Sequence, residues 1–437
     1  MLDGASSDPP IRDHAETLTR EQLRELQLER LRVTVGRVLR GQALGAQRLA
    51  AAGITAPSDL ASLADVARIP FASKSDLRDQ YPFGLLAVPR EDLARIHASS
   101  GTHGKPTIVG YTRADLETWT ELMARCMTMA GVEAGMLLHN ANGYGLFTGG
   151  FGFHQGAERI GATVLPVSGG FTARQAMLLR DLGASVLVAT PSYALVVAQA
   201  LREAGVDPRS LGLKLGCFGG EPWTERLRQE IERALGLSAV NFYGLSEMFG
   251  PGVASECLLA REGLHVQEDH FLLEVIDPGD GSPLAPGAEG ELVFTSLTKE
   301  ALPLIRYRTG DIGAVIEERC RCGRSTARLV GLRGRHDDML IVRGVNLFPS
   351  HVEHVLLGAE GVAPNYRLIV DRPDRMDQLT LECEPAGEGD RELLGRRIEH
   401  LLREQIGLRI AVSILDPGSL PRSEGKAVRV VDQRRAD

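Results

Sequence analysis

The sequence predicts a large α/β domain followed by a smaller α+β domain. With 437 residues the chain is longer than one hydrophobic core usually serves, so two or more domains are expected. Helical stretches alternate with short apolar runs between residues 111 and 220, a pattern typical of parallel strands joined by crossover helices. Near Asp337 the pattern changes to strands around one long helix. Domains are therefore expected over residues 1–336 and 337–437.

The larger domain begins with helical patterns and continues as mostly parallel sheet. The first 20 residues are expected to form a mobile lead-in. From Arg20 to Leu39, leucine and valine recur among charged residues, which predicts an amphipathic helix, although the spacing is only partly regular. Further helices are predicted over residues 113–130 and 171–182, and buried strands over "TVLPV" and "SVLVAT".

The end of the larger domain and the whole of the smaller one are richer in strands. "FLLEVIDPGDGSPLAPGAEGELVFTSL" has two strand-like runs around a turn, which predicts an antiparallel or small β-barrel-like part. Beyond Asp337, "YRLIVD", "LTLECEP" and "RIAVSILD" predict strands, and "RELLGRRIEHLLREQIG" predicts a helix. In that helix Leu394, Ile398, Leu401 and Leu402 recur at helical spacing, so one face should be buried.

Composition restricts the class of protein. Hydrophobic residues make up 43% and charged residues 24% of the chain, as in ordinary globular proteins, and the formal net charge of -8 disfavours nucleic-acid binding. No apolar run approaches the roughly 20 residues that span a bilayer. The acidic N-terminus lacks the features of a secretory signal, so a cytoplasmic protein is expected, in which six cysteines do not indicate a disulfide framework.

A short loop, "HASSGTHGKPT", gathers groups that bind anions. Backbone amides of a glycine-rich turn converge on a phosphate, and hydroxyls and a lysine add donors; these residues are Ser99, Ser100, Gly101, Thr102, Gly104 and Lys105. The spacing differs from the phosphate loop of P-loop ATPases and GTPases. His103 stands among them, where a neutral ring donates one hydrogen bond and a protonated ring adds positive charge. The alternative is a flexible surface turn of small residues.

Further motifs follow this loop in a fixed order. They are "GGEPW" at Gly219, "YGLSE" at Tyr243, "YRTGD" at Tyr307, "GRHDDMLIVRGVN" at Gly334 and "PRSEGKAVR" at Pro421. Together with the loop they resemble the phenylacetate-CoA ligase family of the adenylate-forming (acyl-CoA synthetase) superfamily, from about residue 26 to residue 432.

The resemblance implies a two-step ligase reaction. ATP would activate an aryl carboxylic acid, of the arylacetic or substituted benzoic type, to an acyl-adenylate with release of pyrophosphate. CoA would then form the thioester and release AMP. One alternative keeps adenylation but transfers the acyl group to an amine or to a carrier-protein thiol; another is a non-catalytic nucleotide-binding relative, against which the presence of both Glu247 and Lys426 argues. The partners implied are small molecules, without nucleic acid or membrane, and a homodimer is left open.

The resemblance also implies roles for single residues. Residues 99–105 would hold the ATP phosphates, with Lys105 counted among the catalytic groups, and Glu247 would bind Mg²⁺. Tyr243 would lie near the adenine, whose pocket would be lined by Gly219, Gly220, Glu221 and Pro222.

Four more roles concern the ribose and the smaller domain. Asp311 would accept hydrogen bonds from the ribose hydroxyls, and Arg335 would lie close to ribose and phosphate. Asp337 would be the hinge of a mobile C-terminal lid domain that carries Lys426, the cation that neutralises charge during adenylation. Gly344 would lie near the path of the thiol.

The stretch "HNANGYGLFTGGFGFHQGAE" lies where this family builds its acyl pocket. Tyr144, Phe147 and glycines such as Gly149 are expected to form a flat apolar slot for an aryl group. The family usually has tyrosine where Asn142 stands, and an amide there favours a substrate with hydroxyl or amino groups. The alternative is that Asn142 is a loop residue without ligand contact.

Four residues suggest a structural zinc site. Cys320 and Cys322 form a C-x-C pair followed by glycine, and Cys257 and His265 lie upstream. Three thiolates and one imidazole complete a tetrahedral zinc shell. The alternative is a set of unpaired cysteines in a reducing cytosol.

Overall fold

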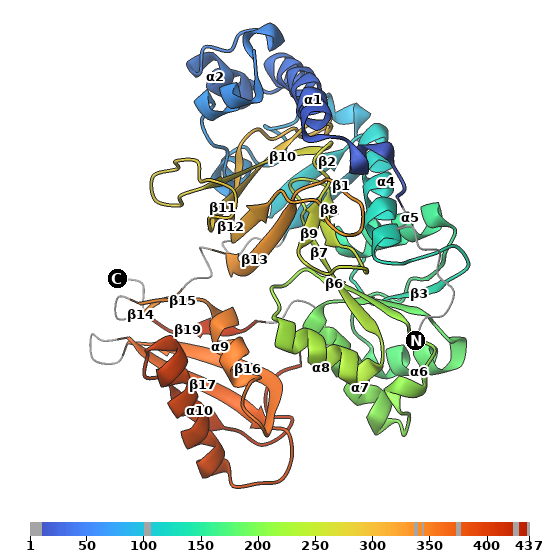
Figure 1. Ribbon diagram of the computed structural model, residues 1–437, viewed down its shortest axis with the longest axis vertical. Coiled ribbons are helices and arrows are strands. Elements are labelled where there is room, and N and C mark those ends of the chain that lie inside the picture. The colour runs from blue at the N-terminus through green and yellow to red at the C-terminus, as the bar shows by residue number, and fades with distance from the viewer. Residues whose placement is uncertain are drawn as a thin grey trace.

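A mixed sheet of eleven strands forms the centre of the larger domain (Figure 1). The computed structural model describes residues 11–99, 106–335, 340–342, 345–372, 377–422 and 428–434. Five strands at one end are parallel, in the order β4-β3-β5-β6-β7. Their bounds are β3 Leu137–Asn140, β4 Thr163–Leu165, β5 Val186–Ala189, β6 Leu215–Gly219 and β7 Ser238–Leu245.

Crossover helices cover both faces of this parallel part, as the alternating sequence pattern predicts. Their bounds are α4 Arg113–Met129, α5 Gly149–Ile160, α6 Thr172–Leu182, α7 Pro191–Glu203 and α8 Glu225–Leu235. Buried residues of α6, α7 and α8 pack on one face of the strands, and those of α4 and α5 pack on the other (Figure 1). Successive side chains of a strand point to opposite faces, so β5 supplies Leu187 to the first core and Val186 and Val188 to the second.

The antiparallel part predicted around residues 271–297 continues the same sheet. Its order is β10-β11-β12-β13-β9-β8, so β13, the last of these strands in the chain, lies between β12 and β9. The bounds are β8 Gly250–Glu256, β9 Leu264–Val266, β10 Phe271–Ile276, β11 Gly290–Ser296, β12 Tyr307–Ile316 and β13 Arg328–Arg335. A separate antiparallel pair, β1 (Arg95–Ser99) and β2 (Thr107–Tyr111), flanks the predicted phosphate loop.

Helices at the N-terminus pack on the antiparallel part of the sheet. They are α1 (Arg20–Gly41), α2 (Ala43–Ala51) and α3 (Lys74–Asp79). The spacing in α1 is irregular because two of its buried positions are polar. Gln27 donates to the Glu268 carbonyl at 2.9 Å and Thr34 to the Leu297 carbonyl at 2.8 Å, so these side chains bury without losing their hydrogen bonds.

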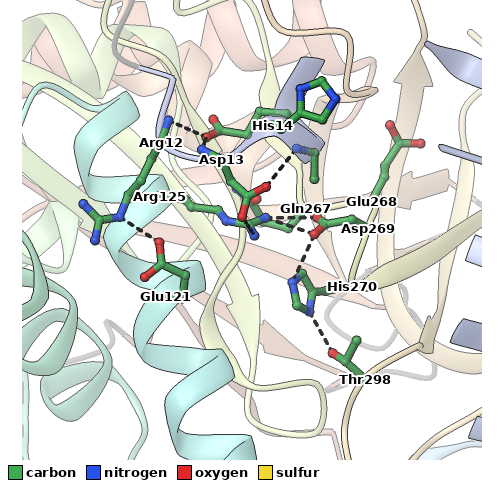
Figure 2. A network of polar contacts seen from close by, with 12 residues as sticks. Arg12, Asp13, His14, Glu121, Arg125, Gln267, Glu268, Asp269, His270 and Thr298 are labelled. Carbon is green, nitrogen blue, oxygen red and sulfur yellow. Dashed lines mark hydrogen bonds and ion pairs between the residues drawn. The ribbon is translucent and has the colours of Figure 1, made fainter. Parts of the chain in front are cut away.

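The prediction of a mobile lead-in is wrong from residue 11 onward. Residues 11–19 form a packed segment that includes a short 3-10 helix, His14–Thr17. Arg125 of α4 forms ion pairs with Asp13 of this segment and with Asp269, and Arg12 pairs with Glu121 at 2.7 Å (Figure 2). Polarity alone suggested disorder, but partners more than a hundred residues away neutralise these charges.

The smaller domain is built on a four-stranded sheet in the order β18-β17-β16-β19. The fold class predicted from the sequence is thus confirmed in both domains. The bounds are β14 Leu340–Val342, β15 Val345–Leu347, α9 Pro349–Leu356, β16 Val362–Asp371, β17 Gln378–Pro385, α10 Arg391–Ile406, β18 Ala411–Ile414 and β19 Val430–Asp432. Ile398 and Leu402 of α10 are fully buried against this sheet, with Leu394 and Leu401 partly buried, as their spacing predicts.

Helix α9 connects the two domains. It contacts β13, where Ser350 donates to the Arg333 carbonyl at 2.6 Å. Arg226 of α8 donates to the His354 carbonyl at 2.9 Å. The proposed boundary and hinge at Asp337 lie outside the described residues. Among the described helices, none combines the length and the apolar character needed to cross a lipid bilayer.

We expect the stability of the smaller domain to fall as the pH rises through about 7, because of Glu353 in α9. Burial raises the pKa of Glu353 to about 7, since the nearby Arg429 only partly offsets the desolvation and Glu221 adds repulsion. A raised pKa means that the folded protein favours the neutral carboxyl. The neutral carboxyl therefore stabilises the folded state fully below about pH 4.5, the pKa of the unfolded chain, and this stabilisation is lost as the pH rises from there to about 7. Its size is on the order of 3 kcal/mol.

Urea unfolding of the wild type and Glu353→Gln between pH 5 and 8 measures this effect. Glutamine keeps the neutral shape, so its unfolding free energy should not show the wild-type decrease. Glu404→Gln, at an exposed position of α10, is the matched control. Parallel pH curves for wild type and Glu353→Gln would contradict the prediction.

Candidate active site

A cavity of about 520 Å³ opens where β6 and β7 end beside β12 and β13. Its lining includes three of the four residues predicted for an adenine pocket, Gly220, Glu221 and Pro222, together with Tyr243 and Asp311. These residues come from three separate motifs. The parallel strands β6 and β7 bring Gly220–Pro222 and Tyr243 to one edge of the sheet, and the antiparallel strand β12 adds Asp311.

Tyr243 and Asp311 are joined directly inside this cavity. The Tyr243 hydroxyl donates to Asp311 Oδ2 at 2.6 Å. Tyr243 lies in β7, and its ring stacks on Phe294 with centroids 6.1 Å apart. Asp311 lies in β12, opposite the backbone of Arg335 in β13. A ring and a carboxylate on one wall of a nucleotide-sized cavity provide a stacking surface and an acceptor for hydroxyl groups.

The glycines of "GGEPW" are required by the backbone at the end of β6. A Cβ on Gly219 would lie 2.2 Å from the Phe242 carbonyl oxygen, so β6 and β7 approach too closely for a side chain. Gly220 has a φ of 85°, which turns the chain out of the sheet toward the cavity. Glu221 then accepts from the backbone of Ser192 at 2.7 Å, at the N-terminus of α7.

Glu247, the predicted magnesium ligand, lies in the loop between β7 and β8 and is 7% exposed. Two side chains, those of Tyr111 and Lys299, contact the backbone carbonyls of this loop. The Tyr111 hydroxyl lies 3.2 Å from the carbonyl oxygens of Ser246 and Phe249 and shares its one hydrogen between them, and Lys299 donates to the Glu247 carbonyl at 3.1 Å. A carboxylate is a hard oxygen donor, and Mg²⁺ in phosphoryl-transfer sites uses one or two of these with substrate phosphates, so the residue type fits that ion.

Three of the four residues predicted for the acyl pocket lie close together. Asn142 and Tyr144 belong to the segment between β3 and α5, and Gly149 begins α5 with its hypothetical Cβ 3.7 Å from that of Asn142. Tyr144 accepts from Asn140 at 2.8 Å, and its ring meets Phe151 edge-on.

Phe147 is 54% exposed and is not brought into this group. Its neighbours nevertheless link the segment to the rest of the site. The Leu146 carbonyl accepts from the His97 ring and from the Ala98 backbone of β1, the strand that leads into the predicted phosphate loop, each at 3.0 Å. The Thr148 and Ser246 hydroxyls lie 3.3 Å apart, next to Glu247.

Other predicted residues cannot be placed. The side chain of Ser99 and the whole of Ser100, Gly101, Thr102, His103, Gly104 and Lys105 lie outside the described part of the chain, as do Gly344 and Lys426. Only the backbone of Arg335 is described, as the end of β13 beside Asp311.

The four predicted zinc ligands meet at one point. The ligand atoms of Cys257, His265, Cys320 and Cys322 all lie within 4.8 Å of one another, and all four residues are buried. The Cys257 and Cys320 sulfurs are 3.9 Å apart, and Cys322 Sγ is 3.5 Å from His265 Nε2. A tetrahedral ion with Zn–S bonds of about 2.3 Å separates two sulfurs by about 3.8 Å, so the spacing fits zinc.

Neighbouring side chains also hold the cluster in a form that suits a metal ion. His265 Nδ1 lies 3.0 Å from the Thr326 hydroxyl, which orients the ring so that Nε2 faces the sulfurs. Arg324 donates to Cys322 Sγ at 3.8 Å and forms a buried ion pair with Glu16 of the N-terminal segment.

Several residues of the site had no role assigned from the sequence, including Trp223, the last residue of the motif "GGEPW". Trp223 and Asn241 line the cavity, and Lys299 and Tyr111 hold the Glu247 loop. One signal was available: Lys299 interrupts an apolar run, "VFTSLTKEALPLI", where a lysine needs a partner if it is buried.

Comparisons of the sequence match both domains to known families. Residues 22–298 match the AMP-binding enzyme family, and residues 344–434 match the AMP-binding enzyme C-terminal domain. A phenylacetate-coenzyme A ligase of Thermus thermophilus is 48% identical over 439 residues, covering 96% of this chain and 98% of that protein. A phenylacetate-coenzyme A ligase of Escherichia coli is 46% identical and covers 97% of both.

A solved enzyme, 2-hydroxyisobutyryl-CoA ligase, has a similar structure. Its postadenylation state, in complex with an acyl-AMP, superimposes with a TM-score of 0.91 at 29% identity and covers 97% of this chain and 94% of that one. Its thioesterification state, with CoA, gives a TM-score of 0.73 at 31% identity, covering 98% and 94%. The whole chain therefore superimposes more closely on the postadenylation state than on the thioesterification state.

Proposed function

Because the chain belongs to the phenylacetate-CoA ligase family of AMP-binding enzymes, we propose that it activates an aryl carboxylic acid with ATP and transfers the acyl group to CoA. The observation that carries this proposal is the cavity in which Tyr243 and Asp311 are hydrogen-bonded opposite Gly220–Pro222. The protein is thus an AMP-forming ligase that makes a carbon–sulfur bond.

The residues at the cavity suit the first half-reaction. A carboxylate oxygen attacks the α-phosphorus of ATP, and the bond to the β-phosphate oxygen breaks with release of pyrophosphate. Asp311 would accept hydrogen bonds from the ribose hydroxyls, and Tyr243 would contact the adenine. Glu247 would hold Mg²⁺, which neutralises phosphate charge when bound. The protein then catalyses the reaction mainly by positioning the carboxylate and the α-phosphate and by stabilising the charge on the phosphate oxygens.

The second half-reaction requires other groups near the same adenylate. The thiol sulfur of CoA attacks the acyl carbon, and AMP leaves with the carboxylate-derived oxygen. We place the hinge at Asp337, with Lys426 serving adenylation and Gly344 lining the thiol path. The phosphate loop, residues 99–105 with Lys105 and His103, and Arg335 complete the proposal. A whole-chain superposition closer to the postadenylation state is consistent with rotation between the two steps.

The decisive experiment is acid-dependent exchange of pyrophosphate into ATP over a panel of aryl acids. Product identification by mass spectrometry with CoA, with an amine and with a carrier-protein thiol then fixes the acceptor. Exchange with an aryl acid and a CoA thioester as the main product is expected. Exchange without thioester would support the carrier or amine alternative, and no exchange with any acid would support the non-catalytic alternative.

Asn142 points to the class of acid. Its side chain stands beside Gly149 at the start of α5, and its backbone N–H donates to Asn140 Oδ1 at 3.2 Å. An amide at this position favours a ring with hydroxyl or amino substituents over plain phenylacetate. Phenylacetate as the best substrate by a wide margin in the exchange panel would contradict this assignment.

We also propose a structural zinc ion at Cys257, His265, Cys320 and Cys322. Its support is the spacing of the four ligand atoms and the contact with the Thr326 hydroxyl that orients the His265 ring. Four protein ligands fill a tetrahedral shell and leave no position for substrate, so the role would be stabilisation.

Metal analysis of gently purified protein should find about one zinc per chain. Cys322→Ser removes one thiolate, so its zinc content and melting temperature should both fall, and a chelator should lower the wild-type melting temperature. Cys383→Ser, at a fully buried cysteine of the smaller domain, is the matched control and should retain the metal. The assignment would be contradicted if the purified wild type contained no zinc and its melting temperature did not change when the chelator was added.

A further inference from the structure

Lys299 is a fully buried lysine directly beneath the Glu247 loop. It lies in the connection between β11 and β12 and has 0% exposure. Its ammonium donates to the Glu247 carbonyl at 3.1 Å. It also lies 4.5 Å from the ring centroid of Tyr111 and 5.2 Å from that of Phe249, within the range of cation–π contact. A lysine with this burial is costly unless its contacts are specific.

Asp115, at the start of α4, fixes the backbone that presents Lys299. It has 0% exposure and accepts from the backbones of Glu300 at 2.7 Å and Ala301 at 2.9 Å, the two residues that follow Lys299. Burial lowers the pKa of Lys299 to about 7, and the charge of Asp115 opposes that shift. A buried carboxylate therefore anchors the connection and offsets part of the cost of burying the lysine.

Thr298, the residue before Lys299, is also held in place by polar contacts. The Thr298 hydroxyl lies 2.8 Å from His270 Nδ1, and His270 Nε2 lies 3.1 Å from Asp269 (Figure 2). Asp269 is in turn paired with Arg125 of α4 at 3.0 Å. The residues before and after Lys299 are thus both tied to polar groups of the core, so the lysine has a fixed place from which to reach the loop.

The backbone of the Glu247 loop is consequently held by two side chains, Tyr111 and Lys299. Tyr111 holds the carbonyls of Ser246 and Phe249, and Lys299 holds the carbonyl of Glu247 between them. We propose that Lys299 is a positioning residue of the acid-activating reaction, which fixes the Glu247 loop so that the carboxylate is set for the metal ion of Mg–ATP. This inference rests on the proposed function. Lys299 acts through Glu247 and touches neither substrate nor metal.

Lys299→Met tests the inference, since methionine keeps much of the volume and removes the ammonium. The Mg²⁺ concentration for half-maximal pyrophosphate exchange should rise at least about tenfold and kcat should fall, because misplacing a catalytic group is costly. KM for the acid should stay within about twofold of the wild-type value. Lys299→Arg, which keeps the charge, should restore part of the loss.

Arg306→Met is the matched control. Arg306 is also a buried cation, paired with Glu274 at 2.9 Å and bonded to two backbone carbonyls. Its loss should lower stability without changing the Mg²⁺ requirement, which separates a positioning effect from a folding effect. If Lys299→Met does not fold, Lys299→Leu replaces it, because leucine also removes the ammonium and its contact with the Glu247 carbonyl.

A binding measurement reads the same effect without turnover. Trp223 lines the cavity, whereas Trp119 is fully buried, so quenching of tryptophan fluorescence reports nucleotide binding. Mg²⁺ should lower the dissociation constant for ATP in the wild type, and the ratio of the dissociation constants without and with Mg²⁺ should be smaller in Lys299→Met. If Lys299→Met leaves both the Mg²⁺ concentration for half-maximal exchange and this ratio of dissociation constants unchanged, the role of Lys299 is overturned and the ligase function is not affected. Absence of wild-type exchange with every acid would instead overturn the proposed function.

Discussion

Glu247→Gln is expected to lower acid-dependent pyrophosphate exchange by at least about a hundredfold, the usual cost of removing one group that stabilises transition-state charge. Glutamine nearly keeps the shape of glutamate but removes the negative oxygen that a magnesium ion needs. The loop should keep its place, because Tyr111 and Lys299 bind its backbone and not the Glu247 carboxylate. The loss should therefore appear in the chemistry and not in the melting temperature.

The two half-reactions separate this role from a general defect. With a synthetic acyl-adenylate and CoA supplied directly, Glu247→Gln should form thioester at a rate near that of the wild type, since no pyrophosphate leaves in that step. Glu274→Gln is the control, because Glu274 is a glutamate of β10 that pairs with Arg306. Equal losses in both half-reactions would refute the assignment of Glu247 to the metal.

Asp311→Ala is expected to lower kcat/KM for ATP by about a hundredfold. A hydrogen bond to a charged acceptor contributes roughly 1.5 to 3 kcal/mol, and two ribose hydroxyls would lose theirs together. The substitution also leaves the Tyr243 hydroxyl without its acceptor at 2.6 Å inside the cavity. The measurement is steady-state kinetics with ATP varied at a saturating concentration of the acid.

Tyr243→Phe is the matched control for Asp311. It removes the same Tyr243–Asp311 hydrogen bond but keeps the carboxylate and the ring, so the loss should stay below about tenfold. Comparable losses in both variants would mean that the hydrogen bond between the two residues matters, and that Asp311 has no separate contact with the nucleotide.

The sequence was most informative where a local pattern decides the structure. The spacing of apolar residues predicted the buried face of α10, and the alternation of runs predicted the parallel strands. The motifs containing Tyr243 and Asp311 were recognised separately, and only the structure shows that β7 and β12 bring them within one hydrogen bond across 68 residues. Residue roles on the predicted phosphate loop stay predictions.

Sequence patterns were least informative for buried polar groups. Gln27 and Thr34 made the α1 pattern look weak, because their partners are carbonyls hundreds of residues away. The groups that hold Lys299 could not be identified from the sequence for the same reason, since Asp115 and the Glu247 carbonyl are distant in the chain. Periodicity measures hydrophobicity along one element and carries no information on which distant group satisfies a polar side chain.

The ion pair between Glu16 and Arg324 has a consequence for synthesis on the ribosome. The two residues are 308 positions apart, so at about 5 to 20 residues per second the N-terminal segment waits roughly 15 to 60 seconds for its partner. Near the end of that interval β9 (Leu264–Val266) also lacks its neighbour β13, which begins at Arg328, and one edge of β9 is open to other chains. The larger domain can therefore close only late in translation, and the nascent chain is expected to depend on chaperones until Arg324 and β13 have emerged.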